Sequence, residues 1–214
     1  MLQPEWVLLR WLGLNLVLSS GLATAAELYS WHGFDTPVVA NRRYDVALHA
    51  RLRSRHELHY LDQLRMGGTI RWRLSARLIP FAGAYYQPQQ LRAHQWTEGS
   101  RYFGGAEAPF KLTDSLALTA RLVAERFVGT GRPDYNRYRS SERLLIGRGR
   151  LAPYLQNEWL AVRQGFQATR NSGGLRVRVS PQLSFEGGYL FEIRRTAWGG
   201  NRQAIVTAIR WQQR

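Results

Sequence analysis

The sequence predicts an all-β protein, an antiparallel transmembrane β-barrel of about ten strands (range about eight to twelve) that follows an N-terminal signal peptide. Three observations predict this fold. Apolar and polar residues alternate through most of the chain, the alternating segments are long, and short turns between them alternate with longer loops. Because a strand points successive side chains to opposite faces, each segment has one apolar and one polar face.

The N-terminus has the pattern of an export signal. Arg10 precedes an apolar run from Trp11 to Leu22, and small residues follow as far as Ala26. The run is shorter than the ~20 residues that cross a bilayer as a helix, so we expect a cleaved signal peptide rather than an anchor. The predicted divisions are residues 1–26 as signal peptide, 27–42 as an N-terminal segment or extra strand, 43–211 as the barrel, and 212–214 as a short tail.

The alternation is clearest in RYDVALHARLR, where Tyr44, Val46 and Leu48 share a face opposite Asp45 and the arginines. It recurs in QLRMGGTIRWRL, SLALTARLVAERF, NSGGLRVRVS and LSFEGGYLFEIR. The segments from Arg43 onward number about ten, and many have roughly 11 to 13 residues, a length that suits a tilted transmembrane strand. We expect an even strand count, which returns both ends of the barrel to one side of the membrane.

Alternation is compatible with two architectures. A soluble periplasmic barrel that carries an apolar ligand would turn its apolar faces inward, whereas an outer-membrane barrel turns them toward lipid. Aromatic residues near the predicted strand ends favour lipid, as in an interfacial girdle. They are Trp72, Phe110 and Trp211 near the short turns and Tyr86, Tyr102 and Phe191 near the loops.

The charge pattern indicates which face lines the lumen. The net charge is +15, Lys111 is the only lysine, and the arginines are spread singly through the strands rather than clustered. This placement, with the export signal, argues against nucleic-acid binding. An enclosed lumen must pair its charges, and carboxylates lie among the arginines on the same faces.

The predicted lumen network therefore combines arginines and carboxylates of the polar faces. Its principal members are Arg51, Arg71, Arg73, Arg121, Glu125, Arg143, Glu158, Arg176, Arg178, Glu186 and Glu192. Arg43, Arg53 and Arg139 are placed on the same faces. Two interpretations of these residues stay open. In the first, the charged side chains only fill and stabilise the lumen. In the second, the excess of arginines over carboxylates makes the lumen positive, so that it serves as a narrow anion path or an anion-binding scaffold. Loop arginines such as Arg92, Arg132 and Arg137 are candidates for lipopolysaccharide phosphates.

The sequence contains no recognisable catalytic or metal site. The chain has no cysteine, and HELH (His56–His59) lies at a strand–loop junction rather than on a helix. Ser30 lies close to His32 and Ser141 adjoins Glu142, but neither pair gives a recognisable triad. We therefore expect no cofactor and no enzyme, with a lipid-modifying outer-membrane enzyme as an alternative that His49 would serve.

Several stretches resemble a known family. They are HQW (94–96), LTARLVAERF (118–127), RYRSSERLLIGRGRLAPYLQNEWL and TRNSGGLRVRVSPQLSFEGGYLFE. Over about residues 57–211 the chain resembles the proteobacterial domain-of-unknown-function family 2490, regarded as small outer-membrane β-barrels. The resemblance implies a Gram-negative outer-membrane location, with membrane lipids, lipopolysaccharide and the barrel-assembly machinery as partners, but no site residues. Outer-membrane barrels usually end on an aromatic residue, whereas here three polar residues follow Trp211.

Overall fold

A computed structural model describes residues 27–55, 60–92, 95–129, 133–147 and 149–211, and these form one β-sheet. The strands are β1 (Glu27–Ala40), β2 (Tyr44–Arg55), β3 (Tyr60–Trp72), β4 (Ile79–Tyr86), β5 (Gln89–Arg92), β6 (Gln95–Thr97), β7 (Ser100–Lys111), β8 (Leu116–Val128), β9 (Tyr135–Ile146), β10 (Leu151–Val162), β11 (Gly165–Arg178), β12 (Leu183–Arg194) and β13 (Arg202–Trp211). A 3-10 helix, η1, spans Thr196–Trp198. Within these ranges no helix is long and apolar enough to cross a membrane.

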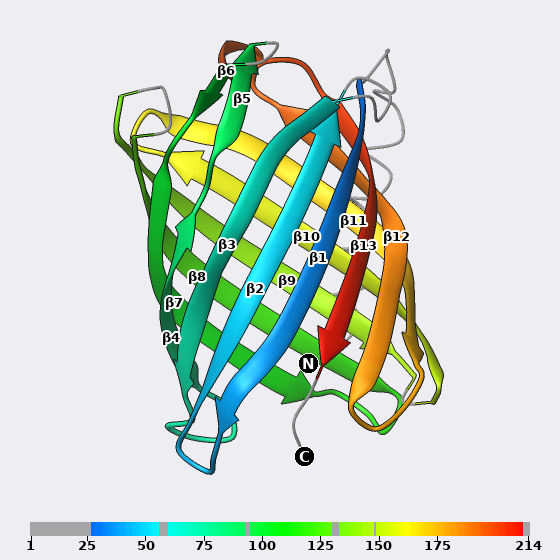
Figure 1. Ribbon diagram of the computed structural model, residues 1–214. Helices are drawn as coiled ribbons and strands as arrows, with labels where there is room; N and C mark the ends of the chain where they lie inside the picture. The colour runs from blue at the N-terminus through cyan, green and yellow to red at the C-terminus, as the bar shows by residue number, and fades with distance from the viewer. Residues whose placement is uncertain (1–26, 56–59, 93–94, 130–132, 148, 212–214) are drawn as a thin grey trace, which may run out of the picture.

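The sheet closes into a barrel (Figure 1). From β2 round to β13, neighbouring strands of the wall pair antiparallel. β1 completes the ring, pairing antiparallel with β2 and parallel with β13. Of the thirteen strands, β5 and β6 form a hairpin outside the ring, which leaves eleven in the closed wall. The predicted all-β barrel, with a strand number between eight and twelve, is confirmed.

The prediction of an even strand number and of wholly antiparallel pairing is wrong. The segment from Tyr44 to Trp211 supplies ten wall strands, and β1 adds an eleventh that extends the sheet instead of filling the lumen. Antiparallel neighbours alternate in direction, so an odd count forces the first and last strands to run the same way. The β1–β13 pair is accordingly parallel, in register from Glu27↔Arg202 to Asp35↔Arg210.

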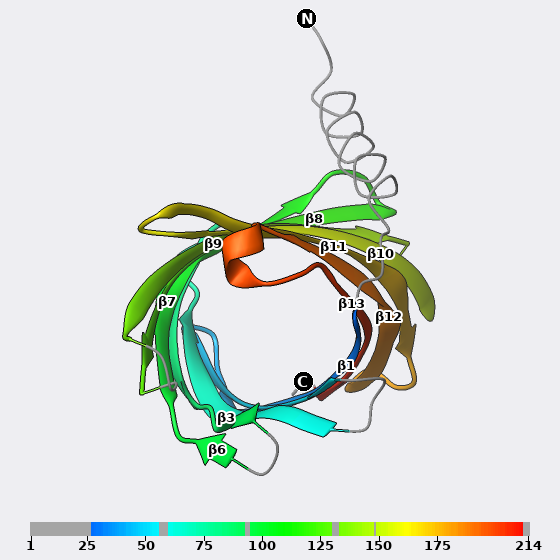
Figure 2. The same cartoon turned by 90° about the horizontal axis from the view of Figure 1, so that it is seen from above.

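The two ends of the barrel differ in their connections. One end, here called the turn end, carries the short connections 41–43, 73–78, 112–115, 147–150 and 179–182. The opposite loop end carries the β5–β6 hairpin, residues 129–134 and η1. Seen from above, η1 leans over the mouth of the barrel (Figure 2), and the ring of Trp198 approaches that of Tyr135, with 6.1 Å between centroids. The β5–β6 hairpin was not predicted from the sequence.

The arginine faces of the strands line the lumen, and the apolar faces cover the outside. In β2, Asp45 and Ala47 are buried, whereas Leu48 and Leu52 are 51% and 42% exposed. The lumen interior also holds two small apolar clusters, one around Tyr29 and Leu190 and one around Phe81. The enclosed space is therefore filled by a mixture of charged, polar and aromatic side chains, as the narrow bore of a small barrel requires.

Aromatic side chains mark both rims of the apolar outer surface. Trp72, Phe110 and Trp211 are exposed at the turn end, and Tyr86 and Tyr102 are exposed at the loop end. Phe191 lies in β12 and is partly buried. Such belts match the position that amphipathic rings take at the two membrane–water interfaces.

Glycine is required where β11 and β12 approach each other closely. A Cβ atom built on Gly174 would lie 2.1 Å from the carbonyl oxygen of Gly187, whereas a Cβ on Gly187 meets no heavy atom within 4 Å. We expect Gly174→Ala to force the two strands apart at a cost of about 1–3 kcal/mol. The measurement is the urea midpoint of the folded barrel. Gly187→Ala, in the neighbouring strand, is the matched control and should leave the midpoint unchanged; an equal shift in both variants would contradict this account.

Candidate functional site

The loop half of the lumen contains a chain of alternating charges. Glu125 on β8 is fully enclosed, and its oxygens lie 2.8 Å from Arg101 Nη2 and 2.5 Å from Arg137 Nε. Arg139 on β9 lies between two carboxylates, 3.7 Å from Glu125 and 3.4 Å from Glu158 on β10. Each of these carboxylates is shared by more than one guanidinium, which suits the fork of donors that arginine carries.

The chain continues through Arg170 on β11. Arg170 Nη1 donates to Glu158 Oε2 at 2.8 Å, and Arg170 Nε donates to Glu192 on β12. Glu192 also pairs with Arg194 at 3.0 Å. Consecutive wall strands from β7 to β12 are thus joined by ion pairs inside the lumen. Removing one partner from a buried pair leaves an uncompensated charge, which is far more costly than the loss of an exposed pair.

Three further carboxylates anchor the turn half of the lumen. Asp45 accepts from Arg71 Nε at 2.6 Å and from Arg73 Nη2 at 3.3 Å. Glu186 accepts from Arg143 at 2.7 Å and from Arg210 at 3.0 Å. The Asp45 pairs connect the adjacent strands β2 and β3. Glu186 on β12 connects the adjacent strand β13 and, across the lumen, β9.

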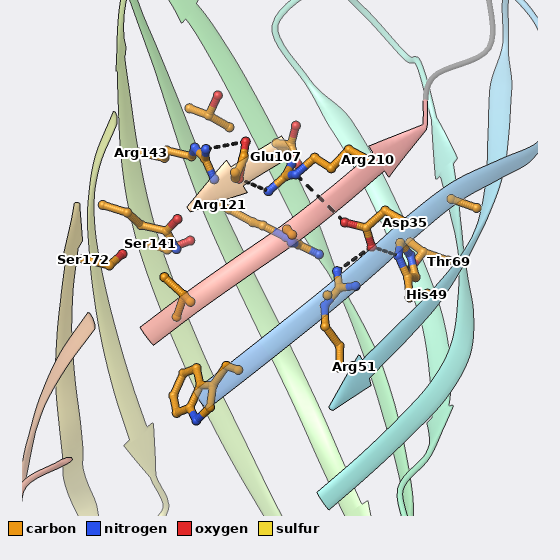
Figure 3. Close-up of a pocket in the computed structure, with 18 of the residues that line it drawn as sticks. Asp35, His49, Arg51, Thr69, Glu107, Arg121, Ser141, Arg143, Ser172 and Arg210 are labelled. Atoms are coloured by element: carbon orange, nitrogen blue, oxygen red, sulfur yellow. Dashed lines mark hydrogen bonds and ion pairs between the residues drawn. The ribbon is translucent and has the colours of Figure 1, made fainter. Parts of the chain in front are cut away.

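The third carboxylate, Asp35, holds the parallel seam. It lies on β1 and contacts His49 and Arg51 on β2, while Arg210 on β13 approaches to 4.0 Å (Figure 3). His49 Nδ1 is 2.5 Å from Asp35 Oδ1, and His49 Nε2 is 2.9 Å from Thr69 Oγ1 on β3. With the proton on Nδ1, His49 donates to Asp35 and accepts the hydrogen bond of the Thr69 hydroxyl. This relay ties β1 to both β2 and β3.

The paired charges surround open space. The larger cavity has a volume of about 800 Å³, and a second cavity of about 200 Å³ lies toward the loop end. Among the described residues, twelve arginines and five carboxylates line the larger cavity. Two further carboxylates, Glu125 and Glu192, pair with three of these arginines, so the arginines remain in excess. Arg53, Arg65 and Arg170 line both cavities, so these three guanidiniums lie at the boundary between them.

Several lumen arginines rest on aromatic rings rather than on carboxylates. The guanidinium carbon of Arg53 is 3.9 Å from the Trp31 ring centroid, and that of Arg121 is 4.1 Å from the Phe81 centroid. Arg121 Nε and both Arg101 Nε and Nη1 are buried without a hydrogen-bond partner among the described residues. A ring holds a cation in place without neutralising it, so these groups keep donors available for an anion.

The structure distributes the predicted network residues through this lumen. Arg51, Arg71, Arg73, Arg121, Arg143, Arg176, Glu158 and Glu186 line the larger cavity, Glu192 lines the smaller one, and Glu125 lies within the charge chain. Arg178 lies at the end of β11 and is exposed. The predicted lumen residues Arg53 and Arg139 also line the larger cavity, whereas Arg43 precedes β2 in an exposed turn.

The alternation of apolar and polar residues did not identify every member of the network. Asp35, Arg101, Arg170 and Arg210 belong to the network but were not predicted. Arg137, predicted as a loop residue for lipopolysaccharide, is instead buried against Glu125, because β9 begins at Tyr135. The signal peptide, His56–His59, Arg132 and residues 212–214 lie outside the described residues, as does the side chain of Arg92.

No group of three metal-ligating side chains of the His, Asp and Glu type occurs in the described part of the chain. Ser141 points into the cavity, as Figure 3 shows, and the adjacent Glu142 lies on the opposite face of β9. The two side chains therefore do not face each other. Ser30 and His32 are hydrogen-bonded at 3.0 Å, with Thr207 at 2.8 Å on the other ring nitrogen.

The charge chain predicts a large difference between buried and exposed carboxylates. We expect Glu125→Gln to leave the guanidiniums of Arg101 and Arg137 uncompensated and to destabilise the barrel by about 3–5 kcal/mol. Asp134→Asn removes an exposed partner of Arg126, 3.1 Å away, and should cost at most about 1 kcal/mol. Urea unfolding of both variants measures the difference; a Glu125→Gln midpoint equal to that of Asp134→Asn would contradict a role for the chain in stability.

Comparison with known proteins supports the architecture. A solved NanC porin structure superimposes with a TM-score of 0.55 at 10% sequence identity, covering 88% of this chain and 100% of that one. No curated protein matches the sequence significantly. The family described as "Protein of unknown function (DUF2490)" matches residues 29–203, which contain β2 to β12 in full, nearly all of β1 and only the start of β13. The chain therefore belongs to the DUF2490 family.

Proposed function

We propose that this protein is a non-enzymatic β-barrel of the Gram-negative outer membrane whose lumen binds small anions and offers them a narrow path. The observation that carries the proposal is the excess of arginines over carboxylates, among the described residues, around a cavity of about 800 Å³ inside the barrel. Enclosed positive charge raises the local concentration of anions, and unpaired guanidinium donors can replace part of an anion's hydration shell.

The outer surface supports the membrane location. Large apolar side chains are exposed around the wall, and aromatic residues mark both rims. The strands of the closed wall have between 8 and 14 residues, a range that includes the ~9–11 needed for a tilted membrane strand. The structural neighbour is itself called a porin, which agrees with this proposal.

The same surface disfavours the soluble alternative. A periplasmic carrier of an apolar ligand would need its apolar faces inside, whereas Leu48, Leu122 and Leu175 point outward and are exposed. A lumen lined by arginine has little to offer an apolar ligand. At the loop end, Arg163 and Arg195 are exposed and are suited to lipopolysaccharide phosphates. Folding through the barrel-assembly machinery follows from the proposed location.

The enzyme alternative has one observation in its favour and one against it. Asp35, His49 and Thr69 are hydrogen-bonded in the order carboxylate, imidazole, hydroxyl. Hydrolases with a hydroxyl nucleophile use the same order, in which the carboxylate orients the histidine and the histidine acts as the base. The relay faces the lumen, however, where a lipid in the surrounding bilayer does not reach it. The relay also holds the β1 seam, so its hydrogen bonds have a structural purpose without catalysis.

The boundary between the two cavities gives the sharpest test of the anion path. We expect the purified protein in a planar bilayer to conduct, with a reversal potential under a KCl gradient that indicates anion preference. Arg53→Gln combined with Arg65→Gln removes two charges at the boundary and should lower the anion-to-cation permeability ratio by about tenfold, because each charge acts in an enclosed site.

Arg195→Gln is the matched control, since it removes the same charge from an exposed position at the loop end. It should leave the permeability ratio unchanged. Absence of conductance would remove the path, and phosphate binding measured by calorimetry would then decide whether the lumen is an anion-binding scaffold. Equal selectivity of the double variant and the unmodified protein would contradict the assignment of the boundary.

A further inference from the structure

Two arginines at the boundary between the cavities differ from most of the lumen arginines. Arg53 on β2 and Arg65 on β3 each line both cavities. Their neighbours on β2, Arg51 and Arg55, each pair with an aspartate. In the described part of the chain, neither Arg53 nor Arg65 makes an ion pair with a carboxylate. The boundary therefore holds two cations whose charges no adjacent carboxylate cancels.

The two guanidiniums belong to neighbouring strands and repel each other. Gln63 is the register partner of Arg53, and Arg65 follows Gln63 by two residues, so the two arginines are diagonal neighbours on the inner face. Their mutual repulsion is joined by an attraction of Arg53 to Glu192, but Glu192 already pairs with two other arginines. Like charges enclosed in this way are costly unless an opposite charge joins them.

Both guanidiniums are held in place and still face open space. Arg53 rests on the Trp31 ring, and Arg65 Nε donates to Gln63 Oε1 at 2.7 Å, while Gln63 Nε2 donates to Gln89 Oε1 at 3.2 Å. The terminal nitrogens of Arg65 and all three nitrogens of Arg53 have no hydrogen-bond partner among the described residues. Both side chains are partly exposed, and because they point inward, this exposure is to the cavities.

We infer that Arg53 and Arg65 together bind a tetrahedral oxyanion with two negative charges. This chemistry is shared by sulfate, phosphate and the phosphomonoester group of a small metabolite. The inference rests on the proposed binding of anions in the lumen and names their class. The planar fork of one guanidinium matches one edge of such an ion with two hydrogen bonds, and the tetrahedron has a second edge for the other fork. The ion also neutralises both cations, whereas chloride or a carboxylate neutralises one.

Calorimetric titration of the full chain in detergent, at low ionic strength, tests the site with three probes. Sulfate is the doubly charged ion, methanesulfonate keeps the tetrahedral shape with one charge, and glycerol phosphate carries a phosphomonoester. Sulfate should bind at a single site, about tenfold or more tightly than methanesulfonate. Arg53→Gln and Arg65→Gln should each weaken sulfate binding by about tenfold or more, because each removes a set of charge-assisted hydrogen bonds.

Further variants separate the guanidinium fork from its charge. Arg53→Lys keeps the charge but not the planar fork, so it should also weaken sulfate binding. Arg77→Gln, the matched control, removes an exposed arginine at the turn end and should leave the affinity unchanged. Sulfate should raise the urea midpoint of the unmodified protein but not that of Arg65→Gln, since an ion that binds only the folded state stabilises it. Gel mobility with and without boiling shows that each variant is folded.

The outcomes distinguish this site from a general attraction of anions to the lumen. Equal affinity for sulfate and methanesulfonate overturns the site and leaves the anion-binding lumen in place. A sulfate affinity that any of the three boundary substitutions leaves unchanged has the same meaning. No binding of any probe overturns the proposed function, and the site with it. Binding of glycerol phosphate beside sulfate extends the class to phosphomonoesters, and binding of sulfate without it limits the class to free ions; both results support the site.

Discussion

The structure depends on the need to neutralise guanidinium groups that are removed from water. A barrel of this size has no room for a wide aqueous channel, so an arginine on the inner face must find a carboxylate, an aromatic ring or a bound anion. Glu125, Glu158 and Glu192 meet this need in the loop half, and each is shared between guanidiniums. The same pairs that satisfy the charges also fix the order and register of six consecutive strands.

Ion pairs inside the lumen also stabilise the place where the barrel closes, the parallel pair of β1 and β13. A parallel pair such as β1–β13 is slightly less stable per residue than an antiparallel pair. Asp35 compensates by contacting both neighbours of β1, through His49 and Arg51 on β2 and Arg210 on β13. Because Arg210 also pairs with Glu186 on β12, the seam is connected to the rest of the charge network. An arginine excess remains after these pairings, and that remainder is the basis of the proposed anion affinity.

Strand alternation, together with the aromatic strand ends and the charge pattern, predicted the barrel and much of the lumen, since Glu125, Glu158 and Glu192 all occupy polar faces of regular segments. Arg101 and Arg170 were not predicted as lumen residues because the alternation of apolar and polar residues is weak in their strands. Glycines, Gly104 and Gly173, occupy outward positions where an apolar side chain would have marked the outer face. Asp35 was not predicted for another reason: its role depends on the parallel pairing of β1 with β13, which are far apart in the sequence. Alternation carries no signal for such a non-local contact.

The central claim is that arginine faces point inward and apolar faces point to lipid, and cysteine accessibility along β2 tests it most directly. Single cysteines at Leu48, Ala50 and Leu52 are predicted to resist a charged thiol reagent in intact outer membranes and to react with a membrane-soluble one. Cysteines at Ala47, His49 and Arg51 are predicted to show the reverse. Charged-reagent labelling of the Leu48, Ala50 and Leu52 positions alone would turn the arginines outward and contradict the account.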